Sequence, residues 1–440
     1  INRAKDIMFS AIRNTEAGEF GKEKTQNPSV MSELNEQMRQ GIPQKWRGHL
    51  QNGDAALSMV LAYDLLYPFM NDAEIKEYKD ELREMADWLG FEYKGLFSQY
   101  NSTAMGCNHT SVHYGPVGLI VLALGKDESH YTTWLETSKK YIEKYMSVAI
   151  DNDGYIMEGQ GYGSYGVAGV YPLAHALQRA KGPEHEDWFT AYKTPFFSKY
   201  GDQLLWKLLP NDDVIVFNDG RNSSPGEMGV MGALLNKNQE QLWAWLKSDG
   251  YYSNNTFPKA SLGGTYFRQY LFLHDPLSPK AATEQQQGLN KRFESGRVFM
   301  RSGWNKADDA VVGFTSGRDE SYAHNHDDEN NVTFFALGTD FLFDAEYEAR
   351  YSRCHSIPSI GGIEQGYDKS VHESQRYGTM GKIQKFEERK HGDFAQGEAA
   401  DPSTNQAYFP QVVEYFNRKI FFVRDAPYTP YLIFRDDIKL

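Results

Sequence analysis

Residues 322–344 read YAHNHDDENNVTFFALGTDFLFD, and the rest of the chain is organised around this stretch. His324 and His326 stand two positions apart, just before an apolar run that is rich in strand-forming residues, and a second such run ends at Asp344. In an extended chain the two-residue period would point both imidazoles to one face. The two runs flank Gly338-Thr339-Asp340, which predicts a hairpin that returns Asp344 to the histidines.

A metal site is the first hypothesis for this stretch. With His355 further along the chain, His326, Asp344 and His355 would supply two nitrogens and one oxygen to a zinc-like ion, and His324 would lie beside it with another task. An HxH pair alone is equally typical of half-buried strand positions and turns. The hypothesis therefore depends on the acidic residue and the third ligand that follow the pair.

Composition sets wide bounds. With 440 residues, 40% hydrophobic and 24% charged, the chain is expected to form two or three domains with a substantial core. Its net charge of −13 argues against nucleic acid as a partner, because phosphates require a basic surface. An anionic substrate remains compatible, since a local basic cleft or a metal can oppose the global charge. No run of about 18 apolar residues predicts a membrane span.

The two cysteines, Cys107 and Cys354, are too few for a disulfide framework, and we expect buried free thiols. The chain begins without a signal peptide. It is therefore either a cytosolic protein or a mature exported one from which the signal has been removed.

The pattern of the chain changes from helical to β-type along its length. Residues 1–275 predict helices, and those with the clearest periodicity are 54–66, 71–89, 113–124, 131–150, 165–180, 189–208 and 228–246. Residues 276–295 lack periodicity and resemble a linker. The rest predicts an antiparallel sandwich with strands at 296–301, 309–315, 331–337, 339–343, 381–388, 393–399, 411–423 and 429–434. Strand character continues to Ile438, so we expect the sheet to be incomplete at residue 440.

Two stretches in the helical half carry polar residues that a helical core would not favour. Asn108 and His109 are expected in a loop just ahead of an apolar helix, where a helix-capping Asn and a surface His are the alternative. Residues 153–165 alternate four glycines with aromatic and acidic residues. Such a segment lets a backbone approach a ligand and lets tyrosines stack on sugar rings, but it is also typical of an ordinary turn packed by tyrosines.

These blocks together resemble the heparinase II/III-like polysaccharide lyases and the related dermatan-sulfate epimerase. The resemblance rests on Asn108-His109, on Glu158-Gly-x-x-Tyr-Gly-Ser-Tyr165, and on His324-x-His326-x-Asp328 with Asp344, Tyr347 and His355. It implies an α+β multidomain protein. The expected architecture is an incomplete N-terminal α/α toroid at residues 1–275, a linker at 276–295 and an antiparallel β-sandwich at 296–440.

The resemblance also implies roles for single residues. His109 and Tyr165 match the central catalytic pair, Asn108 the residue that pairs with the substrate carboxylate, and His324 a histidine that the β-domain contributes. His326, Asp344 and His355 match the ligands of one divalent metal ion, expected to be zinc, with manganese and calcium as alternatives, in a mainly structural role. Tyr347 matches a second tyrosine, for which Tyr351 is the alternative because its spacing varies in the family.

Further residues are proposed for an anionic polysaccharide substrate. Trp46, Tyr100, Tyr162 and Tyr322 are candidate sugar platforms, Gln51, Asn52 and Glu158 candidate polar contacts, and Arg221 and Arg318 candidate basic subsites, with Arg301 and Arg350 considered beside them. Each arginine is equally typical of a structural ion pair. Glu158 has no obvious acidic partner, which disfavours a glycoside hydrolase.

The chemistry implied is removal of the proton at C5 of a uronic acid. The charge that develops on the carboxylate requires donors already in place, and a tyrosine base requires a lowered pKa. The leading hypothesis is a polysaccharide lyase that acts by β-elimination in the periplasm or outside the cell. A C5-epimerase and a non-catalytic glycan-binding protein are the alternatives. The sequence leaves the polymer and the oligomeric state open.

Overall fold

The computed structural model describes residues 1–13, 50–92, 107–180, 199–220, 233, 237–248, 277–317, 324, 326–345, 351–359, 365, 381–399, 413–425 and 429–440. The chain divides into two compact units. The first contains Ile1–Tyr145 and Gly166–Thr190, and the second contains Met146–Tyr165 and Ala191–Leu440.

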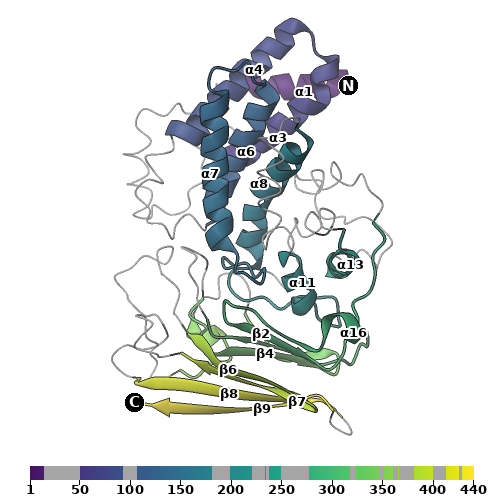
Figure 1. Cartoon of the computed structure of the whole chain (residues 1–440), viewed down its shortest axis with the longest axis vertical. Coiled ribbons are helices and arrows are strands. Elements are labelled where there is room, and N and C mark those ends of the chain that lie inside the picture. The colour runs from purple at the N-terminus through teal and green to yellow at the C-terminus, as the bar shows by residue number, and fades with distance from the viewer. Residues whose placement is uncertain are drawn as a thin grey trace. The chain divides into compact units, whose positions relative to one another are not determined.

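The described part of the first unit is helical (Figure 1). It contains α1 (Asn2–Arg13), α3 (Leu50–Leu66), the 3-10 turn η4 (Tyr67–Phe69), α4 (Asp72–Asp87), the π-helical turn η5 (Trp88–Glu92) and α6 (Asn108–Leu124), and parts of α7 (Tyr131–Ala149) and α8 (Gln160–Arg179). The expected change from helices to strands is confirmed. The α/α toroid stays a prediction.

The central helix of this unit is α6, which is buried along most of its length and contacts both α3 and α4. Its apolar sequence explains that burial. The predicted start of α4 is confirmed, because Asn71 and Glu74 form a reciprocal capping box with bonds of 3.0 and 2.8 Å. Three other starts were predicted too late, because α3 begins at Leu50 rather than residue 54, α6 at Asn108 rather than 113, and α8 at Gln160 rather than 165. Both α6 and α8 begin earlier, because tertiary contacts bury polar and glycine-rich turns that have weak helical propensity.

The second unit contains two antiparallel sheets. The first has the order β1-β2-β3-β4-β5, with β1 (Asn290–Arg292), β2 (Arg297–Arg301), β3 (Val311–Thr315), β4 (Asn331–Ala336) and β5 (Thr339–Leu342). The second has the order β6-β7-β8-β9, with β6 (Lys382–Arg389), β7 (Gly392–Glu398), β8 (Tyr415–Val423) and β9 (Tyr431–Lys439). Short helices accompany them: α11 (Asp202–Lys207), α13 (Gln239–Ser248), α16 (Glu284–Gln287) and the 3-10 turn η7 (Ser352–Cys354).

The two sheets form a sandwich with one shared core, and Figure 1 shows β2 and β4 in one layer above β6 to β9 in the other. Val312 and Phe314 of the first sheet share this core with Ile420 and Phe422 of the second. The expected sandwich is confirmed. Strand β8, which pairs with both β7 and β9, alternates between buried and more exposed residues, as a strand covered on one face does.

Strands β2 and β3 are buried on both faces. The face of the first sheet that lies away from the second sheet contacts Ile215 and Phe217, which precede the predicted linker. A Cβ added at Gly313 would lie 3.1 Å from both Ile215 and Phe217, and Phe217 packs against Phe299 at 6.2 Å between ring centroids. This packing positions Asn218 and Asp219, which follow Phe217, next to the segment before β4 that carries His324 and His326.

The hairpin predicted around residue 338 is confirmed. β4 pairs with β5 in antiparallel register, and Ala336 lies opposite Thr339. The two residues between them, Leu337 and Gly338, have φ values of 52° and 76°, as a two-residue turn of this hand requires.

The predicted linker at 276–295 contains both α16 and β1, and β1 pairs with β2. That part of the expectation was wrong, because short polar strands carry little hydrophobic period and become strands by pairing with a neighbour. The domain boundaries themselves stay a prediction. Cys107 and Cys354 are free thiols as expected, the first buried and the second partly exposed. Among the described helices none is long and apolar enough to cross a membrane.

Candidate metal centre and adjoining histidine

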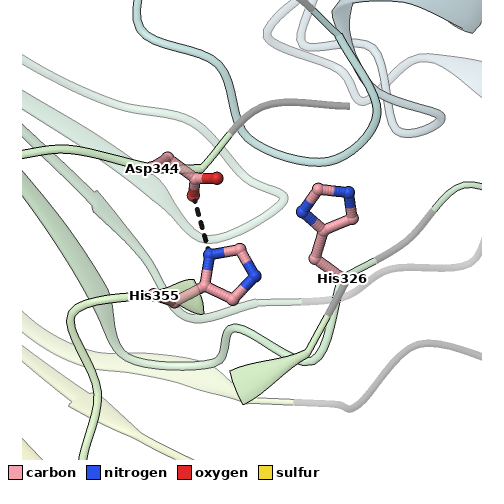
Figure 2. Close-up of side chains that lie close together, drawn as sticks. All are labelled: His326, Asp344 and His355. Atoms are coloured by element: carbon pink, nitrogen blue, oxygen red, sulfur yellow. Dashed lines mark ion pairs between the residues drawn. The ribbon is translucent and has the colours of Figure 1, made fainter. Parts of the chain in front are cut away.

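His326, Asp344 and His355 come together in the second unit, and one ligand atom from each lies within 4.8 Å of the others. Figure 2 shows the two imidazoles and the carboxylate around a common space. All three side chains are buried, and Nδ1 of His355 lies 3.3 Å from Oδ2 of Asp344. The grouping of these three residues, predicted from the sequence, is present in the structure.

Three local structures deliver these side chains. His326 lies just before β4, Asp344 lies just after β5, and His355 follows the turn η7. Asn331 at the start of β4 connects two of them. Its Nδ2 donates to Oδ2 of Asp344 at 2.6 Å, and its Oδ1 accepts from the backbone N–H of Ser356 at 2.9 Å. The hairpin thus brings the acidic ligand back, and one buried amide fixes it.

Gln365 fixes the chain between His326 and β4. Its Oε1 accepts from the backbone N–H of Glu329 at 2.8 Å, and its Nε2 donates to the carbonyl of the same residue at 2.9 Å. Its own backbone N–H donates to Oγ of Ser352 at 2.7 Å. Because Ser352 belongs to η7, Gln365 links the segments that carry the two histidine ligands.

The donor atoms of the triad fit a divalent cation. Nδ1 of His326, Oδ1 of Asp344 and Nε2 of His355 are buried and make no hydrogen bond within the described part of the chain. Buried polar atoms are rarely left unpaired, and an ion would satisfy them. Two imidazole nitrogens and one carboxylate oxygen are a donor set suited to zinc. The identity of the metal stays a prediction.

Electrostatics favour positive charge at this cluster. Burial by itself lowers the pKa of His355, but the carboxylates of Asp344, Asp328 and Asp327 outweigh burial and raise it to about 9. Burial raises the pKa of Asp328 above its ordinary value, although His355 opposes the shift. A pocket of buried carboxylates that holds a proton on an imidazole is also one that attracts a metal ion.

His324 is not in a strand. It has a φ of 73°, and β4 begins only at Asn331, so the expectation of two extended histidines was wrong. Both imidazoles nevertheless reach one group, because Nδ1 of His324 lies 2.7 Å from Oδ2 of Asp219 and Nε2 of His326 lies 3.0 Å from Oδ1. The two imidazoles therefore meet at Asp219 with His324 in a left-handed backbone conformation, and not through the two-residue period of a strand.

Asp219 is the residue that sequence reasoning missed. It is fully buried and stands more than 100 positions before the histidines, in Asn218-Asp-Gly-Arg, where only Arg221 was considered. Its one sequence signal is an acidic residue directly after the apolar run 214–217 and directly before a glycine. A carboxylate that ends a buried strand-like segment is typical of a site residue, but the sequence alone does not identify its partners.

The glycine-rich stretch packs against the loop that carries Asp219. Gly159 has a φ of 88°, and a Cβ there would lie 2.9 Å from Cβ of Asn218 and 3.0 Å from the carbonyl oxygen of Asp219. The backbone N–H of Gly161 donates to that carbonyl at 3.1 Å. The sequence left two explanations for the glycines, close approach to a ligand or an ordinary packed turn. Gly159 and Gly161 support the packed turn, because the absence of a side chain lets the backbone of Asn218 and Asp219 lie against them.

Two tyrosines of the same stretch, Tyr162 and Tyr165, are partly exposed, whereas the three residues of the metal triad are buried. The ring of Tyr162 stacks on the imidazole of His324 with 3.3 Å between centroids and 8° between planes. One face of Tyr162 is thus covered, and its role as a sugar platform stays a prediction. Tyr162, Tyr165 and His324 are all partly exposed, whereas Glu158 is fully buried.

Asn108 and His109 belong to the first unit, where they form the start of α6 rather than a loop. Cys107 is the N-cap residue, so the capping role considered for Asn108 was wrong. Asn108 is fully buried, and His109 is partly exposed. The catalytic roles of both stay predictions.

Several proposed substrate-binding residues lie where the structure describes nothing or only the backbone. Tyr347, Trp46, Tyr100, Tyr322, Arg221, Arg318 and Arg350 lie outside the described residues, and Gln51 and Asn52 are in the first turn of α3, without described side chains. Arg301 is buried and donates to the carbonyls of Trp206 and Leu208 at 3.3 and 2.8 Å. That contact is structural.

Comparison with solved structures identifies the fold. No protein-family model and no curated protein matches the chain by sequence. A crystal structure of heparinase III aligns over 99% of this chain and 59% of its own, with a TM-score of 0.60 and 16% identity. A heparinase III gene product with methylated lysines aligns over 99% of this chain and 60% of its own, with a TM-score of 0.52 and 14% identity. The chain thus spans about three fifths of the length of these proteins, and it has the heparinase III fold.

Proposed function

We propose that the chain is a lyase that cleaves a uronic-acid-containing polysaccharide, of the glycosaminoglycan or alginate type, by β-elimination. The observation that carries the proposal is a partly exposed His324, held between Asp219 and Tyr162, next to a buried metal-type triad on the heparinase III fold. The exposed members of this arrangement are available to a substrate, and the buried ones support them.

The reaction begins at the uronate carboxylate. Removal of the C5 proton places charge on that carboxylate, so donors must be in position before the proton leaves. In the proposal Asn108 and His109 provide them. Both lie in the first turn of α6, and backbone N–H groups at a helix N-terminus add to the positive potential there.

Tyr165 is the proposed base. It lies one turn after Tyr162 on α8, so the two tyrosines lie on neighbouring positions of one helix face, and Tyr162 contacts His324. Deprotonated Tyr165 takes the C5 proton, the C4–C5 double bond forms, and the C4–O4 bond breaks. The leaving O4 then receives a proton from Tyr165 or, when the two groups lie on opposite faces of the sugar, from His109.

His326, Asp344 and His355 would hold the metal ion. When bound, the ion supplies positive charge among buried carboxylates and fixes the β4–β5 hairpin next to His324. Since its proposed ligands all come from the second unit, we assign it a mainly structural role, with zinc as the expected metal. The polymeric substrate places the proposed activity in the periplasm or outside the cell.

A panel of alginate, heparan sulfate, chondroitin sulfate, dermatan sulfate and hyaluronan tests the proposal by ultraviolet absorbance of the unsaturated product. We expect a rise on at least one polymer and a loss of about 10²- to 10⁴-fold in Tyr165→Phe. The matched control is Tyr415→Phe, at a surface tyrosine of β8 that is 39% exposed. Absence of product on every polymer overturns the lyase assignment.

Two other outcomes identify the alternatives. Solvent deuterium that enters C5 without shortening of the chain would identify an epimerase. Binding of a polymer by both the unmodified protein and Tyr165→Phe, without turnover by either, would identify a glycan-binding protein.

A further inference from the structure

The carboxylate of Asp219 contacts two histidines at once, and this decides which nitrogen of each ring carries hydrogen. Oδ2 lies 2.7 Å from Nδ1 of His324, and Oδ1 lies 3.0 Å from Nε2 of His326. An ionised carboxylate accepts hydrogen bonds and donates none. In neutral imidazoles the nitrogens that contact Asp219 are therefore the ones that carry hydrogen.

Each ring then presents its other nitrogen as a lone pair. For His326 that nitrogen is Nδ1, one of the buried triad atoms that make no hydrogen bond to any described residue. For His324 it is Nε2. The same carboxylate thus orients one histidine to bind a cation and its neighbour to accept a hydrogen bond at Nε2.

We propose that Asp219 is a positioning residue that sets the tautomers of both His324 and His326 and so couples the metal centre to the histidine beside it. The part that concerns contact between His324 and a sugar rests on the proposed function. The part that concerns tautomers and metal affinity does not.

The backbone around Asp219 is held tightly enough for this role. Its N–H donates to the carbonyl of His324 at 3.1 Å, and its own carbonyl accepts from Gly161 at 3.1 Å. The neighbouring Asn218 accepts the backbone N–H of His326 at 3.2 Å and donates to the carbonyl of Met157 at 3.2 Å. Asn218 and His324 both have left-handed backbones, at φ 67° and 73°, a conformation that costs energy and persists where the surroundings enforce it.

The ring of His324 is restrained from a second direction. Tyr162 stacks on it with 8° between the planes, so the imidazole cannot turn away from Asp219 without losing that contact. A hydrogen bond along one edge and an aromatic ring on one face together determine where Nε2 points. This geometry distinguishes a positioned histidine from one that merely fills a loop.

The test is Asp219→Asn, which keeps the size of the side chain but replaces one accepting oxygen by a donating nitrogen. One of the two histidines then faces an N–H group and must move its hydrogen to the other ring nitrogen. Nitrogen-15 NMR of histidine-labelled, metal-free protein reads the tautomers directly. The signals are assigned by their loss in His324→Gln and His326→Gln.

The expected results are a changed tautomer at His324 or His326 and a Zn²⁺ affinity about 10- to 100-fold lower by titration. The matched control is Asp425→Asn, which removes an exposed carboxylate that lies 3.1 Å from Nδ1 of His391. The control should keep the affinity for Zn²⁺. With an active substrate, Asp219→Asn should lower kcat on the order of 10²-fold and leave KM nearly unchanged, because it alters the orientation and the hydrogen-bonding nitrogen of His324 and removes no other contact to the sugar.

Two results would overturn the inference. One is Asp219→Asn with both tautomers unchanged and Zn²⁺ affinity equal to that of Asp425→Asn. The other needs no variant to fold: hydrogen on Nδ1 of His326 in the metal-free, unmodified protein contradicts the assignment. Absence of lyase activity, with the tautomers as expected, would instead refute the proposed function and leave the positioning role intact.

Discussion

Asn331 connects the two arms of the metal centre, and Asn331→Ala should weaken both the fold around it and the affinity for the ion. The side chain is fully buried. It donates to the carboxylate of Asp344 at 2.6 Å and accepts from the N–H of Ser356, the residue after His355, at 2.9 Å. Alanine removes both hydrogen bonds, so that Oδ2 of Asp344 loses this donor and the backbone N–H of Ser356 loses this acceptor.

The size of the effect follows from these two bonds. A hydrogen bond to a charged group contributes about 1.5–3 kcal/mol, and a partly buried N–H left unsatisfied costs about 1–3 kcal/mol. We therefore expect the free energy of local unfolding around β4 and β5 to fall by about 3–4 kcal/mol. Because Asn331 orients a ligand, Zn²⁺ affinity should fall by about 10- to 100-fold.

Hydrogen exchange is the suitable assay, since it reports the free energy of local opening in a chain of two units that need not unfold in one step. Protection should fall in β4, β5 and residues 351–359, while β7 and β8 keep theirs. The control is Asn417→Ala on β8, whose Oδ1 accepts from Gln396 at 3.0 Å in a half-buried position. If Asn331→Ala matches this control within about 0.5 kcal/mol and binds Zn²⁺ equally well, the account of the hairpin is refuted.

Three further predictions concern single side chains of the second unit. His326→Ala should lower both bound metal and the melting temperature, whereas the same change at the exposed His391 should alter neither; unchanged metal content, measured by mass spectrometry, would remove the ligand assignment. Burial lowers the pKa of Lys207 from its ordinary 10.5 to about 7, so between these pH values the unfolded chain binds a proton that the native state does not. The contribution of Lys207 to the free energy of unfolding should therefore increase as the pH rises through that window, and the melting temperature should rise with it. Lys207→Met should abolish this pH-dependent increase relative to the unmodified protein. Phe314→Ala should cost about 3–5 kcal/mol in the sandwich core by denaturant unfolding. At Phe341, which is 55% exposed, the same change should cost less than about 0.5 kcal/mol, and equal losses at both sites would contradict the assigned core.

Local pattern was sufficient to predict most of the elements. The capping box at Asn71, the apolar helix α6 and the β4–β5 hairpin all follow from residue types at short spacing, because capping, burial and turn geometry act over a few positions. The strand β1 did not follow, since its Asn-Lys-Arg sequence is polar and its strand form depends on pairing with β2.

The sequence by itself determined the change from helices to strands, the hairpin and the grouping of His326, Asp344 and His355. Only the tertiary structure brought Asp219 to His324 and His326 and turned the expected strand into a left-handed loop. Only the tertiary structure showed, too, that Gly159 and Gly161 pack against the loop that contains Asp219. The physical reason is that propensity and period act between near neighbours. A carboxylate more than 100 positions away meets an imidazole only when packing of the segment at Phe217 on the first sheet carries it there.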